Sequence, residues 1–269
     1  MNIWVHTIVK NEEKFIWYAL ASVVEYVDKI LVWDTGSSDK TLQIIEATGK
    51  LFDGKVEFRR LGEVSAEKMS ALRHDMLEKT DADWVINVDG DEVWWDDSIY
   101  SLTRLISKKG EKLESIVVRT LNPVGDIHHY LPESAGKYQI SGKKGHFNLR
   151  AFSTRIPGLH VSGIYPKESY CDAAGTSLQE KNPYFLDVSY LHLTHLKRSS
   201  FQGSVLGRQH KFKHELGRSF PLDFYFPEVF FRPRPKIVEP PWDVMGPRYF
   251  TRALFATPLK RLKRSLELL

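Results

Sequence analysis

Two aspartates two positions apart, Asp89 and Asp91, combine a residue type and a spacing that suggest chemistry. They follow the short apolar run 84–88, which contains Val and Ile and is typical of a buried strand. Residues two apart on an extended backbone point the same way, and Gly90 between them leaves room for close approach. Carboxylates that converge in this way are typical ligands of a hard divalent cation, Mg²⁺ or Mn²⁺. A solvated acidic turn is the alternative interpretation of this motif alone.

The elements before this motif are expected to place further polar residues beside it. The predicted strands are 3–9, 30–33 and 56–59, and the predicted helices are 15–27, 41–49 and 65–77. Such alternation predicts an α/β fold with a parallel sheet covered on both faces, whose ligands bind beyond the carboxyl ends of the strands. Asn11 and Glu12 follow the first strand and Asp34 follows the second, so a shared cleft is expected. Asp34 capping its own turn is the alternative.

Three motifs resemble the family 2 glycosyltransferases of the GT-A fold. They are VKNEE at 9–13, YVDKILVWDTGSSDKT at 26–41 and DWVINVDGDE at 83–92, in the order and with the spacing of that family. The third is similar to the D-x-D motif of the family. The resemblance implies a Rossmann-like, mostly parallel sheet, a nucleotide-sugar donor and transfer with inversion at the anomeric carbon. UDP is the commonest donor nucleotide in the family, so a UDP-sugar is expected.

The resemblance also implies roles for individual residues. Asp34 would contact the nucleobase, Asp89 would lie near the ribose, and Asp91 would bind the metal. Arg73 falls where the family often has a basic residue that reaches the donor, and a helix-surface arginine is the alternative. The residues assigned to donor binding are Val9, Asn11, Glu12, Asp34, Arg73, Asp89 and Gly90.

The reaction itself requires two further groups. A divalent ion held by Asp91 would act as a Lewis acid and meet the negative charge that develops on the leaving diphosphate. The acceptor hydroxyl must lose a proton as it attacks, which requires a positioned carboxylate or His. Many relatives have a His-Glu pair where this chain has Lys167-Glu168, and Glu168 is the predicted general base, with Asp172 second. A surface acid paired with Lys167 is the alternative for Glu168.

In GT-A enzymes a late histidine sometimes completes the metal shell or touches the diphosphate, so the resemblance implies such a histidine here. Residues 188–195 alternate between apolar and polar and predict a strand. His192 and His195 are three apart and cannot both point the same way. His195 is preferred because it ends the strand and precedes Lys197 and Arg198, two cations that suit a diphosphate. A core or loop histidine is the alternative.

The chain is long enough for one large α/β domain, or for one domain with an appendage. We expect a GT-A domain at 1–215, with a nucleotide-sugar half at 1–110 and an acceptor side at 111–215, followed by 216–269. The last part begins with an aromatic, Pro-rich arm that either wraps the domain or contacts a second subunit in a homo-oligomer. It ends in a basic amphipathic helix predicted from Thr257 and Pro258 onward. Its leucines would lie on an anionic membrane or pack on a protein.

Composition narrows the class of protein. A net charge of +4 is too small to indicate nucleic-acid binding, and one cysteine permits no intrachain disulfide. No signal-peptide pattern and no apolar run of roughly 20 residues occurs, so a cytoplasmic protein is expected, with peripheral membrane association as an option. The acceptor would be a saccharide, a lipid-linked group or a protein. A nucleotidyltransferase, which needs a Gly-rich phosphate loop that 10–13 lacks, and a non-catalytic nucleotide- or sugar-binding module are the competing interpretations.

Overall fold

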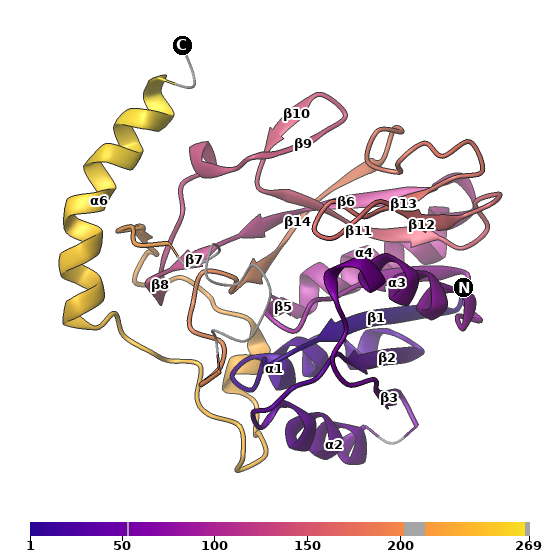
Figure 1. Ribbon diagram of the computed structural model, residues 1–269, viewed down its shortest axis with the longest axis horizontal. Coiled ribbons are helices and arrows are strands. Elements are labelled where there is room, and N and C mark those ends of the chain that lie inside the picture. The colour runs from indigo at the N-terminus through magenta and orange to yellow at the C-terminus, as the bar shows by residue number, and fades with distance from the viewer. Residues whose placement is uncertain (53, 202–212, 267–269) are drawn as a thin grey trace.

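A large twisted sheet forms the centre of the computed structural model, which describes residues 1–52, 54–201 and 213–266 (Figure 1). Its strands lie in the order β3-β2-β1-β4-β11-β6-β14-β5. They are β1 (Ile3–Val9), β2 (Lys29–Asp34), β3 (Val56–Arg60), β4 (Trp84–Asn87), β5 (Glu92–Trp94), β6 (Ser115–Leu121), β11 (Phe147–Ser153) and β14 (Tyr184–His192). The first four neighbours in this order are parallel, which confirms the expected α/β architecture. Strand β11 is antiparallel to both of its neighbours and joins the two halves of the sheet.

Helices cover both faces of the sheet. They are α1 (Ile16–Ala21), α2 (Thr41–Leu51), α3 (Met69–Glu78) and α4 (Asp96–Lys109), with 3₁₀ turns η1 (Val24–Tyr26), η2 (Ala66–Lys68) and η3 (Gly110–Lys112). Ile30 and Val32 of β2 belong to one core with α1, α2 and α4. Leu31 and Trp33 point to the opposite face and pack against Leu72 of α3. Alternate side chains of this one buried strand therefore pack into the cores on the two opposite faces of the sheet.

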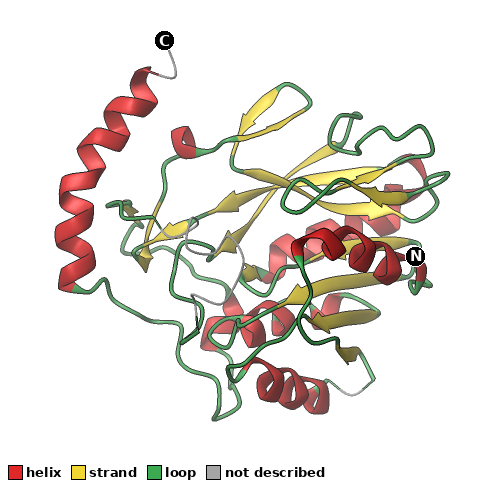
Figure 2. Ribbon diagram, viewed as in Figure 1, coloured by secondary structure: helices red, strands yellow, loops and turns green. Residues whose placement is uncertain are grey.

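Short strands and turns lie between and after the strands of the central sheet (Figure 2). They are β7 (Pro123–Val124), β8 (Asp126–Tyr130), η4 (Glu133–Ala135), β9 (Tyr138–Ile140), β10 (Lys143–Gly145), β12 (His160–Ser162), β13 (Ser169–Cys171) and β15 (Arg218–Ser219). The first five of these segments, β7 to β10, lie between β6 and β11 in the chain. Strand β14 ends at His192, so the strand predicted at 188–195 begins and ends earlier than expected.

The helix expected at 15–27 is shorter than predicted. Helix α1 spans only Ile16–Ala21 and is buried on every side, so it has no polar face. It is covered by the chain segment that carries η6 (Glu228–Phe231). The Tyr18 hydroxyl donates to the Glu239 carbonyl at 2.8 Å, and the rings of Tyr18 and Phe230 meet edge to face at 5.2 Å. The aromatic arm thus wraps the domain, and its boundary at 215/216 stays a prediction.

The last helix, α6 (Pro247–Leu266), begins ten residues before the predicted start at Thr257. Pro247 occupies its first position, which suits proline. Thr257 does not cap the helix, because its hydroxyl donates to the Ala253 carbonyl one turn earlier. Pro258 is accommodated inside the helix, where it removes one backbone hydrogen bond. Within the described residues, no helix is both long and apolar enough to cross a membrane.

Candidate active site

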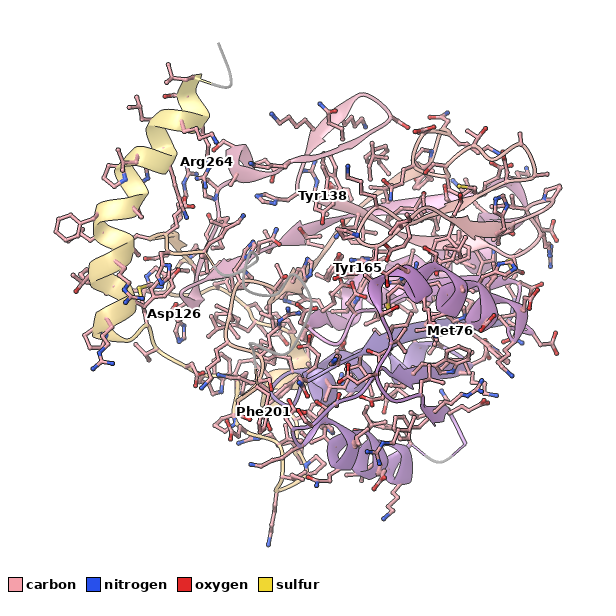
Figure 3. The ribbon with its side chains drawn as sticks, viewed as in Figure 1. Met76, Asp126, Tyr138, Tyr165, Phe201 and Arg264 are labelled. Carbon is pink, nitrogen blue, oxygen red and sulfur yellow. The ribbon has the colours of Figure 1, made fainter. Side chains whose placement is uncertain are left out.

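A cleft with a volume of about 220 Å³ opens at the carboxyl ends of β1 and β4. The predicted site residues that line it are Val9, Glu12, Arg73, Asp89, Gly90 and Asp91. Residues outside the predicted set that line it include Thr35, Tyr138, Arg150, Tyr165, His192 and Arg198. Figure 3 labels Tyr138 and Tyr165, which come from the acceptor side of the chain. The cleft therefore lies between the two expected halves.

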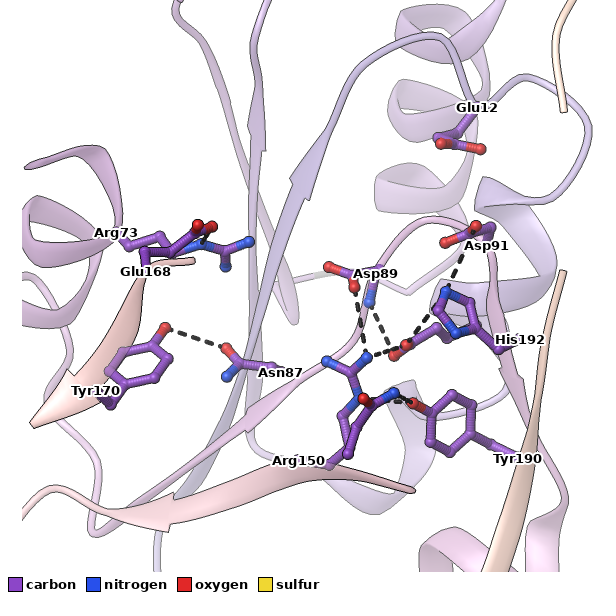
Figure 4. Close-up of polar contacts among 12 residues, drawn as sticks. Glu12, Arg73, Asn87, Asp89, Asp91, Arg150, Glu168, Tyr170, Tyr190 and His192 are labelled. Carbon is purple, nitrogen blue, oxygen red and sulfur yellow. Dashed lines mark hydrogen bonds and ion pairs between the residues drawn. The ribbon is translucent and has the colours of Figure 1, made fainter. Parts of the chain in front are cut away.

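Asp89 follows β4 and is held by two groups. Its backbone N–H donates to Glu92 Oε2 at 3.2 Å, and Arg150 Nη2 lies 3.5 Å from Asp89 Oδ2 (Figure 4). Burial raises the pKa of Asp89, but the charges of Arg150 and Arg73 outweigh this effect and lower it below its usual value. Asp89 is therefore ionised at neutral pH and faces a cationic side of the cleft.

Gly90 lets two elements approach closely. A Cβ atom at this position would lie 2.9 Å from Glu12 Cγ and 3.3 Å from Ile16 Cδ1. A larger residue would push the Asp89–Asp91 turn away from Glu12, so glycine is required by space. This agrees with the prediction that Gly90 leaves room for close approach.

Asp91 lies in a buried network with one arginine and one histidine. Arg198 Nη1 donates to Asp91 Oδ2 and lies 2.9 Å from Glu12 Oε1. Asp91 is 2% exposed and Arg198 is 5% exposed, so the guanidinium bridges two buried carboxylates. His192 Nε2 lies 3.8 Å from Asp91 Oδ2 on the same side (Figure 4). The hydrogen bond from Arg198 to Asp91 is charge-assisted, which makes it stronger than one between neutral groups.

The donor set at Asp91 fits a divalent ion that arrives with a phosphate ligand. Asp91, Asp89 and His192 line the same cleft and offer carboxylate oxygens and an imidazole nitrogen. In the described part of the chain, no group of three or more His, Cys, Asp or Glu side chains converges to hold a metal by itself. An ion here would take further ligands from water and diphosphate, as Mg²⁺ and Mn²⁺ often do. It would also compete with Arg198 for Asp91.

Arg73 and Glu168 meet beside the main cleft. Arg73 Nε donates to Glu168 Oε1 at 3.2 Å, and Glu168 Oε2 is buried with no hydrogen-bond partner among the described residues. Glu168 lines a second, polar cavity of about 130 Å³ that shares Arg73, Asp89 and Arg150 with the main cleft. Arg73 thus points from α3 into the site rather than along the helix surface, and Glu168 pairs with Arg73, not Lys167.

Two predicted donor residues organise the turns instead of lining the cleft. The carboxylate of Asp34 accepts from the backbone N–H groups of Gly36 at 3.0 Å and Ser37 at 3.1 Å. Asn11 has a φ of 54° and accepts from the Ser38 N–H at 2.7 Å, so it ties the turn after β1 to the turn after β2. Asparagine tolerates this left-handed conformation better than most residues.

Two further predicted residues lie away from the cleft lining. The backbone of His195 forms an isolated β-bridge with Val124 beyond the end of β14, while the side chain of His192 lines the cleft. Asp172 accepts from the N–H groups of Ala174 and Thr176 and from Lys181, so it shapes its own loop. His192 ends up at the site because β14 pairs with β5, with His192 directly opposite Glu92.

Arg150 was not among the predicted site residues. Arg150 of β11 donates to the Tyr190 hydroxyl at 2.7 Å, to Glu92 and toward Asp89. Its signal in the sequence is a single arginine inside the apolar run 147–153, where a charged residue needs a buried partner.

Comparison with known proteins identifies the family. The model described as Glycosyl transferase family 2 matches residues 4–157, more than half of the chain. The chain belongs to this family. A TPR repeat-containing protein of Synechococcus elongatus is 36% identical over 86 residues, which are 32% of this chain and 19% of that protein.

The fold of this family 2 glycosyltransferase is also similar to solved structures. Staphylococcus aureus TarS 1–349 in complex with UDP-GlcNAc aligns with a TM-score of 0.51 and 16% identity, over 76% of this chain and 61% of that one. Glucosyl-3-phosphoglycerate synthase from Mycobacterium tuberculosis in complex with Mn²⁺ and UDP-glucose aligns with a TM-score of 0.39 and 14% identity, over 70% of this chain and 69% of that one. The first likeness shows a shared fold, which is GT-A.

Proposed function

We propose that this family 2 glycosyltransferase moves a sugar from a UDP-sugar to an acceptor hydroxyl, with inversion and with a divalent metal. The observation that carries the proposal is the cleft where Asp89, Asp91 and His192 face Arg73, Arg150 and Arg198. Acids suited to a cation and guanidinium groups suited to phosphate meet there at the carboxyl ends of parallel strands. Family membership supports the donor class and the inversion.

Asp91 and His192 would hold the metal, with Asp89 beside them. When bound, the ion supplies Lewis-acid stabilisation of the leaving diphosphate. The chain's own residues supply the rest of the site. Arg198 neutralises Asp91 and Glu12. Once a metal binds Asp91, the guanidinium of Arg198 would bind phosphate oxygens of the donor.

The nucleoside end of the donor would lie beside Val9 and Thr35, which line the cleft at the ends of β1 and β2. Asp34 acts there by fixing the turn that presents Thr35, because its carboxylate binds the N–H groups of Gly36 and Ser37. The predicted contact of Asp34 with the nucleobase therefore becomes a positioning role in the proposal.

Glu168 is the proposed general base. It is partly buried beside Arg73, at a cavity that adjoins the main cleft, and its buried Oε2 atom has no hydrogen-bond partner among the described residues. An acceptor hydroxyl next to this oxygen would donate its proton there as it attacks the anomeric carbon. The proposed acceptor is a saccharide, a lipid-linked group or a protein. The proposed location is the cytoplasm, where the nucleotide-sugar donor would be available.

The decisive experiment measures Mn²⁺-dependent release of UDP from UDP-sugars, with and without a mixture of acceptors. We expect turnover in the unchanged chain and at least about a 100-fold loss in Asp91→Asn, because charge stabilisation of the leaving group is typically of that size. Glu111→Gln, which alters an exposed carboxylate remote from the cleft, is the matched control. Donor binding without turnover under every condition would support the non-catalytic module instead.

Glu168→Gln separates the base from the metal site. The amide cannot take a proton, so transfer to an acceptor should fall while binding of UDP and Mn²⁺ is retained. If transfer is unaffected, Glu168 is not the base. Asp172→Asn is the comparison, because Asp172 was the second candidate and its carboxylate shapes its own loop.

A further inference from the structure

Helix α6 carries its polar contacts on the face that meets the protein. Arg264 binds Glu215 through two hydrogen bonds of 2.6 Å, and Lys260 donates to the His214 carbonyl at 3.0 Å. Thr257 Oγ1 accepts from the Leu216 N–H at 2.8 Å. Figure 3 labels Arg264 on the side of α6 that faces the body of the molecule. These anchors fix the rotation of the helix about its own axis.

The opposite face of α6 is apolar and exposed. Its large side chains and their exposed fractions are Leu254 49%, Phe255 74%, Leu259 71%, Leu262 59% and Leu266 64%. An ordinary surface helix buries such a stripe and exposes its charges. Helix α6 instead leaves its apolar stripe exposed, and it lies at the edge of the molecule with its outer side away from the sheet (Figure 1). An exposed apolar patch of this kind marks an interaction site.

Basic residues border this apolar face. At about 100° per residue, Arg252 and Lys263 fall along one edge of the stripe and Arg261 along the other, and all three side chains are exposed. The helix sequence 247–266 contains no Asp or Glu. A stripe of Phe and Leu between rows of cations complements a surface that is apolar inside and anionic at its rim.

We propose that α6 docks the protein on an anionic lipid bilayer, with Phe255, Leu259 and Leu262 inserted among the acyl chains. Arg252, Arg261 and Lys263 then lie at the level of the lipid phosphates. A second copy of this chain is a poorer occupant, because an isologous contact would bring these cations against the same cations of the partner. The docking is independent of the transfer reaction and holds whichever donor the enzyme uses.

Sedimentation with vesicles tests the proposal on the whole chain. We expect binding to vesicles of phosphatidylcholine with phosphatidylglycerol, much weaker binding to phosphatidylcholine alone, and release by high salt. Replacing Arg252, Arg261 and Lys263 together with Gln should lower binding about 100-fold, since each cation near the surface contributes about a factor of five. The matched control replaces Lys50, Lys79 and Lys109, three exposed lysines on other elements, with Gln.

A second variant tests the apolar face separately. Phe255→Ala, Leu259→Ala and Leu262→Ala together should lower vesicle binding by about tenfold or more, whereas Leu51→Ala, at a side chain 60% exposed on α2, should not. Circular dichroism checks that each variant is folded. Equal binding to neutral and anionic vesicles, binding unchanged in both α6 variants, or no binding would overturn the proposal. So would a dimer in light scattering that the apolar variant dissociates, because the face then belongs to a second copy.

Discussion

At the scale of single residues, three acids of the two adjoining cavities each pair with a different guanidinium. The pairs are Asp89 with Arg150, Asp91 with Arg198 and Glu168 with Arg73. Without such partners, converging buried carboxylates would repel and take up protons. The pairing keeps Asp89 ionised and lets the site exist before a cation or a donor arrives. It also means that a metal at Asp91 has to replace a contact with Arg198.

The first residue-scale prediction concerns Arg198→Gln. Removing one partner of a buried ion pair should lower the free energy of unfolding by about 3–5 kcal/mol, because Glu12 and Asp91 lose their shared cation. Mn²⁺ alone should then raise the melting temperature more in the variant than in the unchanged chain, since the ion meets less competition. Calorimetry with and without Mn²⁺ measures both effects. Equal Mn²⁺ shifts in the two proteins would show that Arg198 does not compete with the ion.

The second residue-scale prediction concerns His6, whose pKa burial lowers to about 3. The unfolded histidine titrates near 6.5, so between these values only the unfolded chain binds the proton. The neutral, buried His6 therefore contributes to the free energy of unfolding above pH ~6.5. This contribution is lost as the pH falls, and the free energy of unfolding is lower by about 2–3 kcal/mol at pH ~4.5. Denaturation at neutral and acid pH should show a smaller acid loss in His6→Gln. An equal loss in both proteins would contradict this.

At the scale of elements, the turns after β1 and β2 are tied together before they contribute to the cleft. Asn11 accepts from Ser38, and the backbone N–H of Glu12 donates to Thr41 Oγ1 at 2.8 Å. Helix α1, which follows Glu12, is held from outside by the aromatic arm, since Tyr18 contacts both Phe230 and Glu239. The arm therefore helps to hold Glu12 in place indirectly, through its contacts with helix α1.

The element-scale prediction compares two neighbouring phenylalanines of η6. Phe230 is 2% exposed and packs on α1, whereas Phe231 is 64% exposed. Phe230→Ala should lower the free energy of unfolding by about 3–5 kcal/mol, because it leaves a cavity in the main core. Phe231→Ala should change it by less than about 0.5 kcal/mol. Urea denaturation measures both, and similar effects for the two variants would show that the arm does not pack as described.

At the scale of the whole molecule, the cleft is assembled from both halves of the sheet. The turns after β1, β2 and β4 supply Glu12, Thr35 and Asp89, while β11 supplies Arg150 and β14 supplies His192. A donor bound there would touch both halves and stabilise them together. The docking helix α6 lies at the edge of the molecule, outside this assembly (Figure 1).

The whole-molecule prediction is that a UDP-sugar with Mn²⁺ raises the melting temperature. At a concentration ~100 times its dissociation constant, a ligand that binds only the folded form adds about 2.7 kcal/mol, or several degrees. Asp91→Asn should lose most of the shift, and so should omission of Mn²⁺. A screen of nucleotide sugars would identify the donor. Equal shifts with and without Mn²⁺ would argue against metal dependence.

The sequence by itself determined the parallel half of the sheet, the family and the acidic turn at Asp89–Asp91. Local patterns predict these features, because an apolar run that ends in Asp-Gly-Asp indicates a buried strand followed by an acidic turn. Tertiary structure alone decided that His192 rather than His195 lines the cleft and that Arg150 and Arg198 neutralise its acids. Those outcomes depend on strand pairing between distant segments, such as β14 with β5, and no local pattern encodes that register.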